Sequence, residues 1–224
     1  MPTTATPAAQ DYLKALFTLG WEAGDSSSVS TTAVAEQLGV APASATNMLK
    51  KLAGMGLVSH RPYRGTSLTA DGRKIALEVI RHHRLLETYL AHALGVPWDE
   101  VHDEAEVLEH VLSEDLEDRI AALLGNPTSD PHGHPIPGKD GSMPVPSARR
   151  LWEVADGELV AVDRVPDSEP ESLRYLGEIG IRPGQSIEVV RRGPGSGPLF
   201  LRVQPPAKEE TAISKELASA VWVS

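Results

Sequence analysis

The stretch VHDEAEVLEH, Val101–His110, concentrates two imidazoles and four carboxylates within ten residues. If it forms a helix, about 100° of rotation per residue brings four of its side chains onto one face. These four candidate metal ligands are His102, Glu106, Glu109 and His110. The remaining surface is apolar and can pack against other helices, and we expect the helix to continue to about Leu124. The pattern indicates a divalent metal site, and a solvated polar face is the alternative.

The composition is that of a globular chain without cysteine. Of its 224 residues, 41% are hydrophobic and 23% are charged, which corresponds to one large domain or roughly two to three small ones. Because there is no thiolate, a metal must be bound by oxygen and imidazole nitrogen. That donor set favours Mn(II) or Fe(II) and also permits Zn(II), Co(II) or Ni(II). The sequence shows no secretion signal and no apolar run of membrane-spanning length, so we expect a cytoplasmic location and no membrane partner.

The net charge of −10 is divided unevenly along the chain. Residues 1–75 carry seven basic and five acidic residues, whereas the remainder carries 14 basic and 26 acidic residues. A slightly basic first third attached to an acidic body suits a DNA-contacting module joined to a cation-binding one.

A helix-turn-helix pattern follows an amphipathic helix that is expected over residues 8–23. Residues 31–40 predict a short helix that ends at a glycine, and residues 43–52 predict a second helix. The glycine allows the tight turn between them, and the second helix of such a motif enters the major groove of DNA. A helical hairpin with a polar surface is the alternative.

Five polar side chains of the second helix are candidates for DNA contacts. Ser44 and Thr46 could bind phosphates, and the amide of Asn47 can pair with adenine. Lys50 and Lys51 would contact the DNA backbone.

Residues 56–69 favour a strand, a basic turn and a second strand, which is the wing of a winged helix. Arg61, Tyr63 and Arg64 would then face phosphates or the minor groove.

The middle of the chain predicts a second long helix from Thr69 to about Leu94, on which His83 and Glu87 share a face at metal-ligand spacing. Together the two long helices are natural dimerisation elements. The segment from Asp130 to about Ser147 is rich in proline and glycine and favours a linker. His132 and His134 within it could bind metal, but an irregular loop makes this the weaker reading.

The last third predicts a small barrel of the SH3 type, because short strands alternate with glycine and proline. A short helix with carboxylates near its start is expected at residues 167–176. The expected strands are Leu159–Val165, Ser186–Arg191, Leu199–Gln204 and Ala220–Val223. The fold class is therefore mainly α with a small β domain: a winged helix-turn-helix over 1–75, a helical metal-binding and dimerisation domain with linker over 76–147, and an SH3-like domain over 148–224.

The order of these motifs closely resembles the diphtheria-toxin-repressor family of metal-dependent transcriptional regulators. The resemblance spans essentially the whole chain and rests on RHHRLLE (Arg81–Glu87), VHDEA (Val101–Ala105), Glu109-His110 and DPHGHPIP (Asp130–Pro137). It implies a homodimeric repressor that binds a palindromic operator in double-stranded DNA and controls metal-ion homeostasis, such as manganese uptake. It also implies no enzymatic activity and no small-molecule substrate.

The resemblance assigns a primary metal site to Asp11, Glu106, Glu109 and His110. Iron-responsive members carry methionine and cysteine at the positions of Asp11 and Glu106. Carboxylates at both positions match the manganese-responsive branch, because Mn(II) is a hard ion that prefers oxygen. An Fe(II)-responsive repressor of iron uptake genes is the alternative. Lys14 departs from those manganese regulators that carry a further glutamate one turn after the aspartate, so their two-ion arrangement does not transfer directly.

The family's ancillary site corresponds to His83, Glu87 and His102, with Glu169 as a carboxylate from the SH3-like domain. The family has an amide where this chain has Ser172, and Glu171 could substitute for it.

Without metal, like-charge repulsion between the clustered carboxylates should keep the first helix loosely docked. Two other classes of function fit parts of the sequence. A metallohydrolase would also use His and Glu ligands, but no general base or substrate loop is evident beside the cluster. A regulator that binds an organic ligand would need an apolar pocket, which an aromatic content of 4% disfavours.

Replacing the two hard carboxylates tests metal selectivity. The double variant Asp11→Met with Glu106→Cys should shift the metal response from Mn(II) towards Fe(II), because thiolate and thioether are softer donors. DNA binding titrated with each ion under anaerobic conditions measures this, and equal activation by Mn(II) would contradict it.

Overall fold

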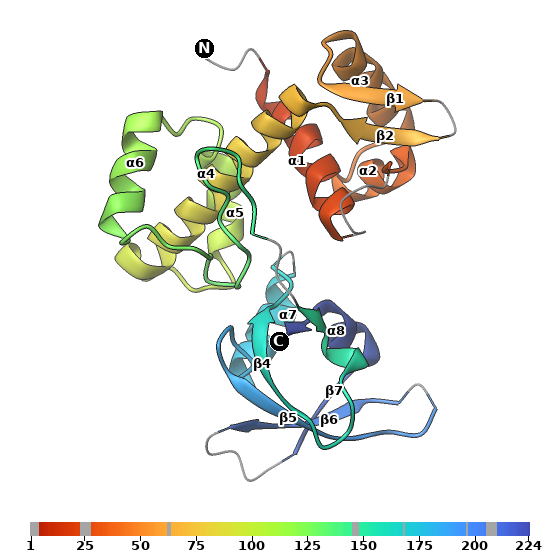
Figure 1. Ribbon diagram of the computed structural model, residues 1–224, viewed down its shortest axis with the longest axis vertical. Coiled ribbons are helices and arrows are strands. Elements are labelled where there is room, and N and C mark those ends of the chain that lie inside the picture. The colour runs from red at the N-terminus through yellow and green to blue at the C-terminus, as the bar shows by residue number, and fades with distance from the viewer. Residues whose placement is uncertain are drawn as a thin grey trace. The chain divides into compact units, whose positions relative to one another are not determined.

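The computed structural model describes residues 5–22, 28–61, 64–144, 148–167, 169–195, 197–204 and 210–224 (Figure 1). The chain divides into two compact units, and the helix α4 (Ala70–Leu94) runs through both. Unit 1 comprises Met1–His82, Glu109–Leu112 and Pro137–Ser142. Unit 2 comprises His83–Leu108, Ser113–Ile136 and Met143–Ser224. Domain boundaries near residues 75 and 147 stay a prediction.

Unit 1 begins with the expected amphipathic helix and winged helix-turn-helix. Its elements are α1 (Pro7–Glu22), α2 (Thr31–Gln37), α3 (Pro42–Gly54), β1 (Val58–Arg61) and β2 (Gly65–Leu68). Ser30 caps α2 by accepting the Ala33 N–H at 3.0 Å, and Pro42 starts α3 at a position where its missing N–H costs nothing. Gly39, between the two helices, has a φ of +61°, which confirms the glycine-dependent turn.

The wing and the three helices share one apolar core. Strands β1 and β2 pair antiparallel from Val58 opposite Leu68 to Arg61 opposite Gly65. The buried side chains that α1, α2, α3 and the wing contribute to this part of the chain include Leu13, Leu16, Phe17, Val34, Leu49, Leu52, Leu57 and Val58.

The single helix predicted from Val101 to about Leu124 is two helices, which corrects that expectation. Helix α5 covers only Val101–Leu108, and α6 covers Glu114–Leu123. Ser113 stops the continuation, because its hydroxyl caps α6 by accepting the Leu116 N–H at 3.3 Å. The acidic residues of the first turn of α6 favour a helix start at the same place. Glu109 and His110 therefore lie in a turn and not on the helical face of His102 and Glu106.

The segment around Asp130–Pro135 is an ordered loop, whereas the sequence favoured an irregular linker. Asp130 Oδ1 accepts the backbone N–H groups of His132 and His134, at 2.8 and 3.0 Å. The backbone N–H of Val165 donates to His132 O at 2.9 Å, so the loop is tied to the strand segment beside it. Such mutual satisfaction of backbone groups fixes a loop despite its proline and glycine content.

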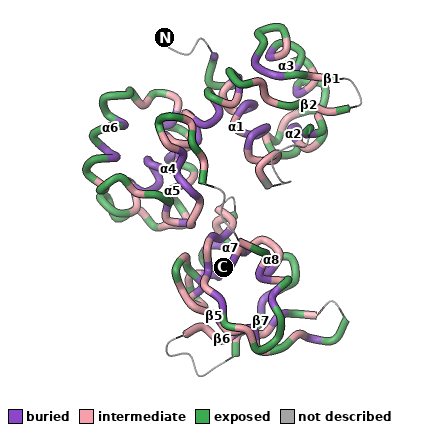
Figure 2. The backbone as a smooth tube through the Cα atoms, viewed as in Figure 1, coloured by how far each residue is buried: buried purple, intermediate pink, exposed green. Residues whose placement is uncertain are grey.

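The β domain is a six-stranded antiparallel sheet in the order β3-β8-β4-β5-β6-β7. Its elements are β3 (Arg149–Arg150), η1 (Leu151–Glu153), β4 (Leu159–Arg164), α7 (Pro170–Glu178), β5 (Ser186–Arg192), β6 (Leu199–Gln204), β7 (Thr211–Ile213), α8 (Lys215–Ala220) and β8 (Trp222–Val223). Three expected strands and the short helix are confirmed. The fourth, expected at Ala220–Val223, covers only Trp222–Val223 because Ala220 ends α8, and β3, β7 and α8 are additional. The buried core gathers on alternate strand positions (Figure 2) and includes Val160, Val162, Ile187, Val189, Leu199 and Leu201.

Among the described residues, no helix combines the length and apolar character that a membrane span requires.

Gly133 tests how tightly the ordered loop is built. Its φ is +90°, and a Cβ there would collide with the carbonyl oxygen of Asp163. Gly133→Ala should therefore lose roughly 1–3 kcal/mol more unfolding free energy than Gly157→Ala, because overpacking adds to the backbone strain. Gly157 is a matched control, since its φ is +82° and nothing lies within 4 Å of the added Cβ. Urea denaturation measures both unfolding free energies. Equal losses in the two variants would show that the loop shifts to accommodate the new methyl group and would contradict the prediction.

Candidate metal centres

A first cluster of candidate ligands lies within unit 1, where α1 meets the turn after α5. We call Asp11, Glu109 and His110 the Asp11 group; one ligand atom from each lies within 4.8 Å of the others. His110 Nε2 is 2.8 Å from Asp11 Oδ1 and 3.6 Å from Glu109 Oε1. The structure thus brings together three of the four residues predicted for the primary site.

Neighbouring polar residues orient the Asp11 group. His110 Nδ1 lies 2.7 Å from Gln10 Oε1, which turns the other ring nitrogen towards Asp11. Lys14 Nζ lies 2.8 Å from Glu109 Oε2, and the Glu109 side chain is 0% exposed. An ammonium beside a buried carboxylate offsets part of the cost of taking that charge out of water.

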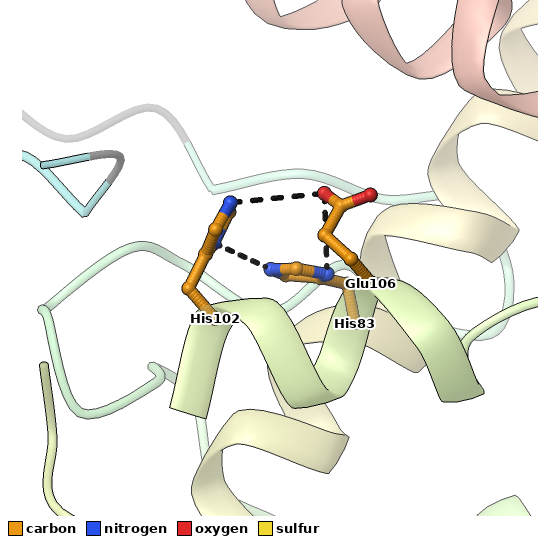
Figure 3. A group of neighbouring side chains, drawn as sticks. All are labelled: His83, His102 and Glu106. Carbon is orange, nitrogen blue, oxygen red and sulfur yellow. Dashed lines mark hydrogen bonds and ion pairs between the residues drawn. The ribbon is translucent and has the colours of Figure 1, made fainter. Parts of the chain in front are cut away.

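A second cluster lies within unit 2, on the facing surfaces of α4 and α5. We call His83, His102 and Glu106 the His83 group; their side chains point towards one another in Figure 3. His83 Nε2 is 3.2 Å from His102 Nδ1. Glu106 Oε1 lies 3.8 Å from His102 Nε2, one helical turn away, and 3.9 Å from His83 Nδ1. Glu106, predicted for the primary site, is thus grouped with the ancillary histidines. Its place beside Asp11 stays a prediction.

The buried carboxylate of Glu87 adjoins the His83 group. Its Oε1 is 3.1 Å from His83 Nε2 and 3.3 Å from His102 Nδ1, as the ancillary-site prediction requires. Burial would raise the pKa of Glu87, but His83, His102 and His132 together hold that pKa well below its usual range. Burial also opposes a charge on His132, yet the Glu87 and Asp130 carboxylates raise the pKa of its imidazole to about 9.

Glu169 and Ser172, the predicted contributors from the β domain, are not in the described clusters of candidate ligands. Both belong to the start of α7, where the Ser172 hydroxyl donates to Glu169 Oε2 at 2.9 Å. Asp167, two residues before Glu169, is the acidic residue that lies with Glu87 and His132. Whether Glu169 binds metal stays a prediction.

The structure brings Asp130, His132, His134 and Asp167 into groups of candidate ligands. The sequence predicts metal binding by His132 and His134 only as the weaker alternative and does not predict Asp130 or Asp167. The signal was present as the alternation Asp-x-His-x-His in residues 130–134. The proline and glycine residues around this alternation favour a linker, which makes a metal site there the weaker prediction. Asp167 belongs to no local sequence motif.

Both clusters fit divalent cations. Their donors are carboxylate oxygens and imidazole nitrogens, the set that Mn(II), Fe(II) and Zn(II) accept. Glu87 Oε2 is buried and has no hydrogen-bond partner among the described residues, which is costly unless a cation or water meets it. Asp11, Glu109 and His110 would hold one ion, and His83, Glu87, His102 and Glu106 would hold another.

Helix α3 presents the residues predicted to contact DNA. Helix α3 exposes Ser44, Asn47, Lys50 and Lys51, and Arg64 is exposed in the turn immediately before β2. Thr46 is half-buried, and its hydroxyl donates to Pro42 O at 2.8 Å, so its hydrogen is occupied within the helix. Tyr63 lies outside the described residues.

Family models match all three parts of the chain. Residues 4–66 match the iron-dependent repressor N-terminal DNA-binding domain, and residues 69–138 match the iron-dependent repressor metal-binding and dimerisation domain. Residues 149–224 match the FeoA domain.

Individual relatives agree with the family models. The iron-dependent repressor IdeR of Mycobacterium tuberculosis is 34% identical over 202 residues, which are 85% of this chain and 86% of IdeR. The diphtheria toxin repressor of Corynebacterium diphtheriae is 30% identical over 169 residues, 71% of this chain and 75% of that protein. A solved manganese-dependent transcriptional repressor in complex with manganese is 44% identical and has a TM-score of 0.89, covering 96% of this chain and 98% of that one.

Together, the winged helix-turn-helix and the His/carboxylate clusters define a metal-dependent, DNA-binding transcriptional repressor. The chain belongs to the diphtheria-toxin-repressor family, also described as the iron-dependent repressors, as its motifs predicted.

The ion pair between Lys14 and Glu109 should stabilise the metal-free protein. Lys14→Met removes the ammonium and leaves the buried carboxylate without it, so the unfolding free energy should fall by about 1–3 kcal/mol. Lys74→Met, a change at an exposed lysine of α4, should stay within roughly 0.5 kcal/mol of wild type. Urea denaturation in the presence of a chelator measures both, and indistinguishable midpoints would contradict the stabilising role.

Proposed function

We propose that this chain is a Mn(II)-dependent repressor that binds a palindromic DNA operator as a homodimer and controls metal-ion homeostasis, such as manganese uptake. Its place of action would be the cytoplasm, where chromosomal DNA is accessible. The observation that carries the proposal is the Asp11 group, an oxygen-rich cluster that joins α1 to the Glu109–His110 turn.

The position of Asp11 on α1 supports a link between the cluster and DNA binding. Within unit 1, α1 packs against α2, α3 and β2, so it belongs to the DNA-binding module. Glu109 and His110 come from the turn between α5 and α6. Holding Asp11 close to these two residues therefore fixes the module relative to that turn.

The charges of the group explain why it needs a cation. Two carboxylates close together repel each other, and Glu109 is buried where the repulsion is weakly screened. A bound divalent cation supplies the positive charge that offsets this repulsion. Lys14 already supplies part of it in the metal-free chain, and the Lys14–Glu109 and His110–Asp11 contacts hold α1 weakly rather than releasing it.

Reciprocity gives the expected size of the effect. If a divalent ion prefers the DNA-competent arrangement of α1, then DNA binding strengthens by the same factor, typically about 5–150-fold. The Asp11 group can act as a switch only through that difference in affinity between two arrangements.

Exposed apolar side chains support a dimer. Helices α5 and α6 expose Val107 at 72%, Leu116 at 48% and Leu123 at 69%. Apolar groups on two neighbouring helices are suited to a self-complementary interface, and a two-fold dimer matches a two-fold operator. The family model that covers residues 69–138 describes a dimerisation domain.

Iron is the alternative activating ion. The similar proteins of Mycobacterium and Corynebacterium include a repressor described as iron-dependent, whereas the solved 44% identical repressor is described as manganese-dependent. Carboxylates in place of softer donors favour Mn(II) in this chain. We do not propose an enzymatic activity or a small-molecule substrate, because the family consists of DNA-binding repressors.

Metal-stimulated DNA binding tests the proposal. A suitable probe is a duplex selected by the wild-type protein from a random library in the presence of Mn(II). Asp11→Ala and Glu106→Ala should each lose most of the Mn(II) stimulation, about tenfold or more in Kd, because each removes a carboxylate ligand.

The control is Glu104→Ala, which removes an exposed carboxylate two residues before Glu106 on the same helix. It should keep wild-type stimulation, and all variants should remain folded dimers in size-exclusion chromatography. Unchanged Mn(II)-dependent gel shifts in both Asp11→Ala and Glu106→Ala would contradict the proposed Mn(II)-dependent DNA binding through these ligands.

A further inference from the structure

Within unit 1, helix α1 sets a candidate metal ligand and a cation against the same pair of residues. Lys14 follows Asp11 by three residues, so both side chains lie on one face of α1. The ammonium of Lys14 lies 2.8 Å from Glu109 Oε2. The other oxygen, Glu109 Oε1, lies 3.6 Å from His110 Nε2, which is 2.8 Å from Asp11 Oδ1. One oxygen of Glu109 therefore faces the candidate ligands, and the other faces Lys14.

The contact between Lys14 and Glu109 is poorly screened by solvent. The side chain of Glu109 is 0% exposed, and that of Lys14 is 17% exposed. Leu13 and Ala15, on either side of Lys14, are buried, so the backbone of α1 is held in place at this point. Charges in such surroundings act on one another more strongly than charges at the surface do. The Lys14 ammonium is thus a substantial part of the electrostatic field at the Asp11 group.

A divalent ion and the Lys14 ammonium depend on the same carboxylate. An ion that takes Glu109 as a ligand meets a carboxylate whose second oxygen already accepts a hydrogen bond from Lys14. Because the two oxygens share one carbon atom, the two positive charges would lie close together and repel each other. The ion must either bind beside the ammonium or displace it from Glu109. In both cases the ammonium favours the metal-free form.

We propose that Lys14 competes with the activating ion for Glu109 and so sets the concentration of Mn(II) at which the Asp11 group fills. This rests on the proposed function in one respect, since the Asp11 group must bind that ion. Lys14 is not a ligand. It is a positioning residue that acts through Glu109, because it holds the carboxylate while no ion is bound and opposes the charge of an incoming ion.

The competition also defines what metal binding changes at α1. In the metal-free chain, the Lys14–Glu109 contact joins α1 to the turn between α5 and α6. When an ion draws Glu109 towards Asp11 and His110, the long and partly exposed side chain of Lys14 can turn towards solvent. The main attachment of α1 then moves from Lys14 to Asp11, one helical turn closer to its start. Only the difference in free energy between these two attachments can alter DNA binding.

A purely supporting role for Lys14 leads to the opposite expectation. If the ammonium only kept Glu109 in position, its removal would disorder a ligand and weaken metal binding. If the ammonium competes with the ion, its removal strengthens metal binding even though the metal-free fold becomes less stable. The sign of the change in metal affinity therefore separates the two roles.

Mn(II) binding to the full-length protein without DNA tests the proposal, with free Mn(II) measured by electron paramagnetic resonance. The variant Asp11→Ala identifies the binding step that belongs to the Asp11 group. In that step, Lys14→Met and Lys14→Gln should each lower the Kd by about tenfold or more, because a nearby positive charge is lost. Lys14→Gln keeps an N–H group that can donate to Glu109, so it separates the charge from the hydrogen bond.

Two control variants accompany these changes. Lys14→Arg retains a cation beside Glu109 and should remain near the wild-type Kd. Lys74→Met removes an exposed lysine of α4 and should leave the Kd unchanged. Circular dichroism of each metal-free variant shows whether it is folded, and if Lys14→Met does not fold, Lys14→Gln decides.

An unchanged or higher Kd in Lys14→Gln would overturn the proposal, and so would an equally lowered Kd in Lys14→Arg. If either result appeared while Asp11→Ala still removed a binding step, the proposed function would stand and only the role of Lys14 would fall. If Asp11→Ala removed no binding step, the Asp11 group would not be the metal site, and the proposed function would fall together with the role of Lys14.

Discussion

The ionised carboxylate of Glu87, buried with 0% exposure, is the constraint on which the folding of unit 2 around α4 depends. A buried charge is tolerated only when paired and hydrogen-bonded, since its desolvation costs several kcal/mol. The required partners come from three segments: His83 from α4, His102 from α5 and His132 from the 130–134 loop. Because the carboxylate of Glu87 on α4 pairs with imidazoles from α5 and from the 130–134 loop, these contacts hold α5 and the loop against α4. The same arrangement leaves donor atoms facing one another, which is what a cation site needs.

Unit 1 also contains a buried carboxylate, that of Glu109, but its partners are different. Glu109 is buried beside α1, and the ammonium of Lys14 and the imidazole of His110 lie against it. These contacts join the DNA-binding module to the turn between α5 and α6 even without a metal. A divalent ion at the Asp11 group would thus strengthen an existing contact. Because ligands must first be brought together, part of the binding free energy at such a site is folding free energy.

The break between α5 and α6 gives the two clusters separate positions. A continuous helix would place His102, Glu106, Glu109 and His110 on one face as one set of ligands. Ser113 instead starts a new helix, and the turn before it carries Glu109 and His110 towards α1, whereas His102 and Glu106 stay on α5 facing His83. The single cap at Ser113 thus places the ligands in two separate clusters. The cap was readable as Ser followed by acidic residues, but the apolar periodicity across it suggested continuity.

The sequence by itself determined the local elements and the family. Periodicity, Gly39 and the strand-turn-strand pattern sufficed for the winged helix-turn-helix, and the four-residue spacing sufficed to place His83 and Glu87 on one face, because these signals act over a few residues or one helix face. That His102 joins them was implied only by the family resemblance. Only the tertiary structure decided that Glu106 joins the histidines, that Asp167 approaches Glu87, and that the Asp130 loop is ordered. Those outcomes depend on which buried charges and backbone groups find partners far along the chain, and no local pattern encodes such partners.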